Sequence, residues 1–68
     1  MNLRMKRIEK GMTQEEIAAK VGIIQSQISR YEAGISEPNL ETLKKLASIL
    51  DCTVDELLKD PKEGSDGE

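Results

Sequence analysis

Helix start and stop signals recur so closely along the chain that only short helices fit between them. Thr13 and Glu16 have the spacing of a capping box, in which each side chain accepts a hydrogen bond from the other residue's backbone N–H. Thr53 and Glu56 repeat that spacing. Glycines that favour the left-handed end of a helix follow at Gly11, Gly22 and Gly34. Alternating apolar and polar residues are absent, which predicts helices and no strand.

Five helices are expected, at about residues 2–10, 13–21, 25–33, 39–50 and 53–58. The fold class is therefore all-α, in one domain over residues 1–59. A chain of 68 residues buries only about 60% of its unfolded surface, so helix caps and aliphatic packing must supply its stability. The segment DPKEGSDGE has no apolar side chain, and we expect an acidic, disordered tail over residues 60–68.

Composition excludes several classes of function. With one cysteine and no histidine, the chain can form neither an internal disulfide nor a Cys/His metal site. A glycine-rich phosphate loop and a core large enough for a pocket are also missing. We therefore expect no enzyme, no metal, no cofactor and no small-molecule ligand. The absence of a secretory signal and of a long apolar run predicts a cytoplasmic protein without membrane association.

The net charge of −3 argues against a nucleic-acid partner, but the charge is unevenly distributed. Residues 1–34 carry six basic and four acidic side chains, whereas residues 35–68 carry four basic and nine acidic ones. Attraction to DNA depends on the local field and not on the total charge. The first half of the chain therefore stays a candidate for DNA binding.

Residues 14–32, QEEIAAKVGIIQSQISRYE, predict two short helices that cross at a steep angle. Ala18 is small enough for the crossing, and Gly22 can adopt the positive φ that a short turn needs. Apolar residues then face inward at Ile17, Val21, Ile23, Ile28 and Tyr31. The outer side of the second helix is polar and free of acid, with Gln25, Ser26, Gln27, Ser29 and Arg30. Such a face suits contact with base edges and phosphates.

These residues resemble the Cro/C1-type (XRE-like) family of phage-repressor helix-turn-helix domains. The matching stretches are LRMKR, GMTQEEIAAKVG, QSQISRYEAG, EPNLETLKKLASIL and TVDELL, and the resemblance covers residues 3–58. It implies a compact, lambda-repressor-like bundle of five helices and a transcriptional regulator, most often a repressor. It also implies a homodimer on a double-stranded DNA operator, with the helix at residues 25–33 in the major groove.

The same resemblance assigns DNA contacts to individual residues. Base contacts are expected from Gln25, Ser26, Gln27 and Arg30, and backbone contacts from Gln14, Ser29 and Tyr31. Gln can pair with adenine and Arg with guanine, each worth about 1–3 kcal/mol of discrimination. Arg7 and Glu32 match a family ion pair that joins the first helix to the end of the helix that reads DNA. We expect this pair to be partly buried and structural.

The sequence departs from the family pattern at two positions. The residue before Gln25 is usually a capping Ser or Thr, and here it is Ile24. Either the helix begins at Gln25 with an isoleucine exposed beside the DNA, against a thymine methyl or a sugar, or it begins later with Ser26 as its cap. Asp51 stands where the family usually has glycine, and Asp tolerates the left-handed conformation better than most residues.

Plainer interpretations stay open for several of these residues. Residues 25–27 can be a solvated helix face, and Gln14 can serve only as the first residue of its helix. One of Leu57 and Leu58 exceeds what a small monomer buries and is expected in a dimer interface. The alternative function is a protein-interaction module, such as an antitoxin or antirepressor partner, in which the acidic second half would matter more than Arg30. Salt-dependent DNA binding separates the two functions.

Overall fold

The computed structural model describes residues 1–59, and every regular element in that part of the chain is an α-helix. The helices are α1 (Leu3–Glu9), α2 (Gln14–Val21), α3 (Gln25–Ala33), α4 (Leu40–Ile49) and α5 (Val54–Leu58). The all-α class and the five expected helices are confirmed. The acidic tail expected at residues 60–68, and with it the boundary of the domain, lies outside the described residues.

Side-chain caps explain where three of the helices begin. Thr13 and Glu16 form both hydrogen bonds of the capping box before α2, at 3.0 and 2.8 Å. Thr53 and Glu56 form the same pair of bonds before α5. Asn39 caps α4 with its side-chain oxygen. Each of these bonds satisfies a backbone group that the first turn of a helix leaves without an internal partner.

The connection from α4 to α5 turns at Asp51. This residue has φ +57°, the only positive φ of a non-glycine residue within residues 1–59. The left-handed conformation expected there is thus present. The Asp51 carboxylate also forms an exposed ion pair with the ammonium group of Lys10, the C-terminal cap residue of α1. A glycine at position 51 could adopt the same φ but could not form this ion pair.

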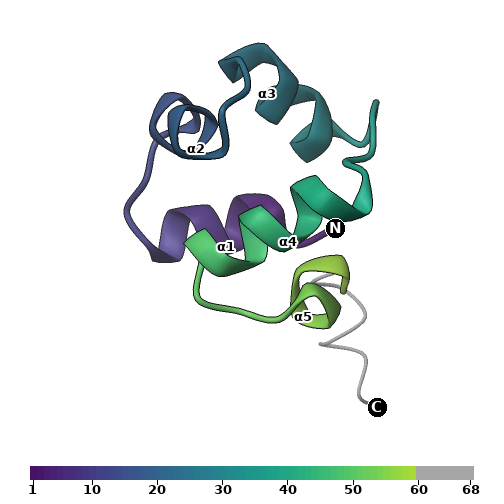
Figure 1. Ribbon diagram of the computed structural model, residues 1–68. Helices are drawn as coiled ribbons and strands as arrows, with labels where there is room; N and C mark the ends of the chain where they lie inside the picture. Colours follow the sequence, from purple (N-terminus) through teal and green to yellow (C-terminus); the bar gives the residue numbers. More distant parts are fainter. Residues whose placement is uncertain (60–68) are drawn as a thin grey trace.

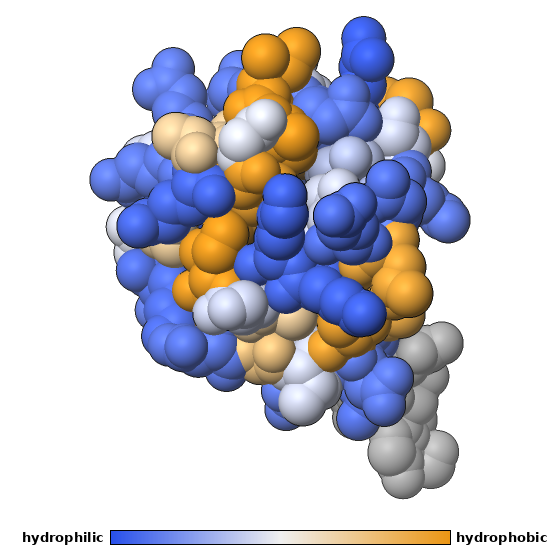
Figure 2. Space-filling model, in the orientation of Figure 1, coloured by the Kyte–Doolittle hydropathy of each residue, from blue (hydrophilic) through white to orange (hydrophobic). Residues whose placement is uncertain are grey.

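The helices are arranged so that α2 and α3 form one end of the molecule and α5 lies at the other, with α1 and α4 between them (Figure 1). α2 packs against α3 and α4, while α5 packs against α4 and α1. The backbone N–H of Asn2 donates to the carbonyl of Leu57 at 2.7 Å, which fixes the start of the chain to α5. Hydrophilic residues cover most of the face seen in Figure 2, and apolar side chains show between them, among other places at the α2–α3 end.

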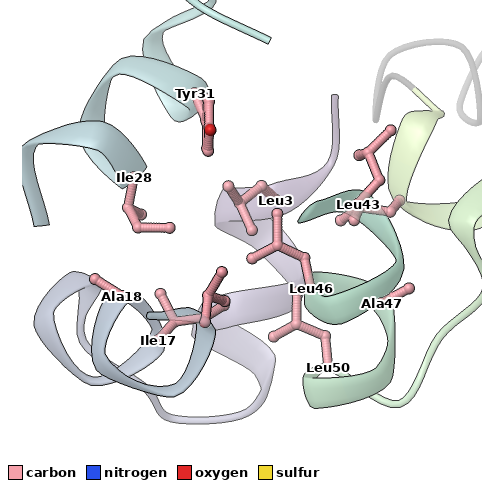
Figure 3. Close-up of a cluster of buried hydrophobic side chains, with 11 residues drawn as sticks. Leu3, Ile17, Ala18, Ile28, Tyr31, Leu43, Leu46, Ala47 and Leu50 are labelled. Atoms are coloured by element: carbon pink, nitrogen blue, oxygen red, sulfur yellow. The ribbon is translucent and has the colours of Figure 1, made fainter. Parts of the chain in front are cut away.

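The core is aliphatic apart from the ring of Tyr31, and it receives side chains from all five helices. Figure 3 shows side chains of α1, α2, α3 and α4 converging around Leu46, which is fully buried. Burial of each large aliphatic side chain contributes about 1.5–3 kcal/mol. At the α5 end, Leu57 is fully buried whereas Leu58 is 51% exposed. Leu58 is thus the leucine of this pair that the folded chain leaves uncovered.

Candidate nucleic-acid interface

The turn between α2 and α3 is built on the backbone carbonyl of Ala18. That carbonyl accepts hydrogen bonds from the N–H of Gly22 at 2.8 Å and from the N–H of Ile23 at 3.0 Å. Gly22 has φ +90°, in the region that residues with a Cβ rarely adopt. The small side chain of Ala18 is buried and lies next to Ile28 of α3 (Figure 3). In Figure 1, α2 is seen nearly end-on while α3 runs across the view, so the two helices cross steeply.

The side of α3 that faces away from the core is polar. Its side chains are Gln25, Ser26, Ser29 and Arg30, which are exposed, and Gln27, which is half-buried. Ile28 and Tyr31 of the same helix are buried in the core. The exposed side chains offer amide, hydroxyl and guanidinium donors and carry no negative charge. A face of this kind can donate hydrogen bonds to base edges or phosphate oxygens without repelling them.

The one carboxylate of α3, that of Glu32, is turned inward against Arg7 of α1. The Nε of Arg7 donates to Oε2 of Glu32 at 2.7 Å, and a terminal guanidinium nitrogen donates to Oε1 at 3.3 Å. The other terminal nitrogen donates to the carbonyl of Met12 at 2.8 Å. The two side chains are only 13% and 7% exposed. The ion pair therefore fixes α3 to α1 and removes an acidic group from the outer face.

Two glutamines extend this ion pair to the surface. The Nε2 of Gln14, the first residue of α2, donates to Oε1 of Glu32 at 2.9 Å. The Nε2 of Gln25, the first residue of α3, donates to Oε1 of Gln14 at 2.5 Å. A continuous chain of hydrogen bonds thus runs from Arg7 to Gln25 across three helices. Sequence reasoning missed the two glutamine contacts, since nothing in the spacing of these residues indicates that they meet.

The Gln14–Gln25 bond leaves Gln25 with unused hydrogen-bonding capacity. Its Oε1 and its second amide hydrogen have no partner among residues 1–59. These two groups are the acceptor and donor that a bidentate contact with one base requires. Since one amide hydrogen is fixed on Gln14, the side chain is held in position before any ligand arrives.

Unlike α2, α3 begins without a side-chain cap. The helix begins at Gln25, and Ile24 is its N-terminal cap residue, with no side-chain hydrogen bond to the first turn. This decides between the two starts that the sequence left open, and the helix with Ser26 as its cap is not formed. The Ile24 side chain is 69% exposed. Apolar side chains reach the surface near α3 at the top of the view in Figure 2, among hydrophilic neighbours.

Tyr31 lies with its ring in the core, at the junction of α3 with the rest of the bundle (Figure 3). Its expected contact with a DNA phosphate stays a prediction. One end of the molecule holds the other residues of the predicted site, which are Gln14, Ala18, Gly22 and the outer residues of α3. The structure therefore brings the sequence-predicted site residues together in two adjacent helices and places their ion pair directly beneath.

Other features of the described chain offer no competing centre. Cys52 is half-buried against the core, and burial raises the pKa of its thiol, which keeps the thiol protonated. Residues 1–59 contain no group of three or more Cys, His, Asp or Glu side chains arranged to hold a metal ion. None of the helices in the same span is long and apolar enough to cross a membrane.

Known proteins are similar to this chain in sequence and in fold. The helix-turn-helix family profile matches residues 3–57. The uncharacterized HTH-type transcriptional regulator YqaE of Bacillus subtilis (strain 168) is 41% identical over 58 residues, which are 85% of this chain and 50% of that protein. The cryptic phage CTXphi transcriptional repressor RstR of Vibrio cholerae is 34% identical over 64 residues, covering 94% of this chain and 58% of that protein.

The fold also matches a solved structure, the N-terminal DNA-binding domain of SinR from Bacillus subtilis. The TM-score is 0.78 at 31% sequence identity, and the match covers 88% of each chain. The chain spans about half the length of the curated relatives it matches. The similarity therefore concerns the five-helix unit that contains α2 and α3.

Proposed function

The chain belongs to the helix-turn-helix family of transcription regulators, and from that premise we propose that it binds double-stranded DNA with α3 in the major groove. The observation that carries the proposal is the outer face of α3. It presents Gln25, Ser26, Ser29 and Arg30 to solvent, while the only carboxylate of the helix is held inward by Arg7. The net negative charge of the chain does not oppose this, because the charge that phosphates meet is the local one.

Gln25 and Arg30 are the strongest candidates for reading bases. With one amide hydrogen on Gln14, Gln25 keeps its Oε1 to accept from adenine N6 and its second amide hydrogen to donate to adenine N7. The exposed guanidinium of Arg30 suits the O6 and N7 acceptors of guanine. Each such pair discriminates its base by about 1–3 kcal/mol. Ser26 and Gln27, on the same turn of the helix, are proposed to complete the base contacts.

Backbone contacts are proposed for Gln14, Ser29 and the hydroxyl of Tyr31. Gln14 uses one amide hydrogen on Glu32 and its Oε1 on Gln25, which leaves its second amide hydrogen for a phosphate oxygen. Gln14 is also the first residue of α2, and a helix N-terminus favours an anion, although the first turn of α2 itself carries the carboxylates of Glu15 and Glu16. Gln14 thus has two proposed roles, to position Gln25 and to contact the DNA backbone.

We further propose that the protein acts as a homodimeric repressor in the cytoplasm. The Vibrio cholerae relative RstR is named a transcriptional repressor. Support for a dimer comes from the exposed side chain of Leu58, which borders a surface depression lined also by Met1, Pro38, Leu43 and the charged Glu37. The depression lies between the α3–α4 connection and α5 and includes no residue of α3, so the outer faces of both α3 helices in a dimer stay free. Two such helices would read half-sites about 10 bp apart.

Selection of bound duplexes from a random pool, at a stated salt concentration, tests the proposal. We expect a pseudo-palindromic sequence to be enriched. The affinity for it should fall steeply between about 50 and 200 mM salt, with log K decreasing by about 0.9 for each phosphate neutralised. A protein-interaction module would bind no duplex at low salt, and that result would reject DNA binding. Sedimentation of the protein with its duplex tests the dimer, since a complex that keeps one protein chain per duplex would reject it.

A further inference from the structure

Ile24 occupies a position where an isoleucine serves the fold poorly. The N-terminal cap residues of α2, α4 and α5 each accept a hydrogen bond from the first turn through a side-chain oxygen. Ile24 cannot, so the first turn of α3 lacks that bond. The side chain also contributes little to the core, since it is 69% exposed. Neither capping nor packing therefore explains an isoleucine at this position.

The surroundings of Ile24 point to DNA as the partner that does use it. The next residue is Gln25, whose amide is held in place by Gln14, and the one after that is the exposed Ser26. Ile24 is thus an apolar side chain at the edge of a polar face that is proposed to read bases. In the major groove, base edges present donors, acceptors and one apolar group, the C5 methyl of thymine.

The two strongly exposed isoleucines near α3 lie at opposite ends of the helix. Ile35 is the other strongly exposed isoleucine near this helix, at 75%. Ile35 follows α3, whereas Ile24 precedes it. The nine residues of α3 between them extend over about 13 Å. The polar side chains of the outer face lie between them. The small apolar surface of Ile24, with the half-buried Ile23 beside it in the sequence, matches a single methyl group better than an apolar protein surface.

We propose that Ile24 contacts the C5 methyl of a thymine in the half-site and so determines specificity for that base pair. The inference rests on the proposed function of α3. It deepens that function, because it adds an apolar contact that reads thymine to the polar contacts that read adenine and guanine. Contact with a sugar instead would add affinity without any preference for a base, and the experiment below separates the two.

Replacement of single thymines by uracil tests the contact, because uracil pairs identically and lacks only the methyl group. In the duplex obtained by selection, each thymine of one half-site is replaced in turn, and the dissociation constant is measured at fixed salt. We expect one replacement to weaken binding of the unaltered protein about fourfold, the factor that burial of one methyl group corresponds to. The Ile24→Ser variant should bind the thymine and uracil duplexes equally, while Ile24→Val keeps the preference.

A matched control is Ile8→Ser, which removes a similarly exposed isoleucine from α1. This variant should keep the fourfold preference for thymine. Melting of the free proteins checks their folding, and Ile24→Ser should melt higher than the unaltered protein because a serine can cap α3. If Ile24→Ser weakened binding to the thymine and uracil duplexes by the same factor, the preference for thymine would remain. That result would overturn the thymine contact and leave DNA binding standing. If no duplex were bound at low salt, the proposed function itself would fail.

Discussion

Breaking the Arg7–Glu32 ion pair should destabilise the whole fold, because this pair joins α1 to α3 with little access to water. The Glu32→Leu variant leaves the guanidinium of Arg7 with only the carbonyl of Met12 as its partner. It also removes the acceptor that holds Gln14. Removal of one partner from a buried pair costs about 3–5 kcal/mol, because the remaining charge stays desolvated. At 13% and 7% exposure the pair is nearly but not wholly buried, so we take the lower end, about 3 kcal/mol.

That loss is large for a chain of 68 residues, whose total stability is about 3–10 kcal/mol. A loss of 1 kcal/mol lowers the melting temperature of a domain of this size by about 4–8 °C. Glu32→Leu should therefore melt about 12–24 °C below the unaltered protein. Circular dichroism in the far ultraviolet follows the melting of the helices directly.

Two further variants make this prediction specific. Lys10→Ala breaks the exposed ion pair with Asp51, whose side chains are 38% and 73% exposed, and should cost less than about 1 kcal/mol. The double variant Arg7→Leu with Glu32→Leu removes both buried charges and should recover much of the stability that Glu32→Leu alone loses. If Glu32→Leu melted no lower than Lys10→Ala, or if the double variant were less stable than the single one, the ion pair would not be the link that joins α1 to α3.

Three other predictions follow from the same structure. Ala18→Leu should overpack the crossing of α2 and α3 and destabilise the fold by about 1–3 kcal/mol, and an unaltered melting temperature would contradict the geometry of the turn. Arg30→Ala should leave the melting temperature unchanged but lower the preference for one base pair by about 1–3 kcal/mol, as measured by competition between duplexes; an unchanged preference would remove Arg30 from the base contacts. The backbone N–H of Thr53 donates to the Glu56 carboxylate and so lowers the pKa of Glu56 below its unfolded value. This cap therefore stabilises the protein above the unfolded pKa, about 4.3, and the stabilisation is lost as the pH falls through the lower pKa of the folded state. Glu56→Gln should therefore show a weaker loss of melting temperature on acidification, and an unchanged acid dependence would contradict that role.

The helices could be predicted from the sequence because their signals are local. A capping box such as Thr13 and Glu16 depends only on residues three apart, and Gly22 marks a turn by its own backbone freedom. The end of α3 at Ala33 was predicted, whereas its first residue stayed ambiguous. The ambiguity had a physical cause, since Ile24 provides no side-chain cap that would mark the start.

The contacts between helices could be predicted only in part. The Arg7–Glu32 pair was expected from a resemblance and not from spacing. The meeting of Gln14 with Gln25 depends on how α2 and α3 cross, and a sequence contains no direct signal for that crossing. Which of Leu57 and Leu58 stays exposed depends on how α5 packs, because both leucines belong to a helix of five residues with little periodicity to read.

The central claim is that the outer face of α3 contacts base edges in the major groove. Intermolecular nuclear Overhauser effects between the protein and its selected duplex test this most directly. We predict contacts from the side chains of Gln25 and Arg30 to major-groove protons of the bases, with none from α5. Contacts that arise only from α4 or α5, or a complex in which the side chains of α3 stay in contact with solvent alone, would contradict the account.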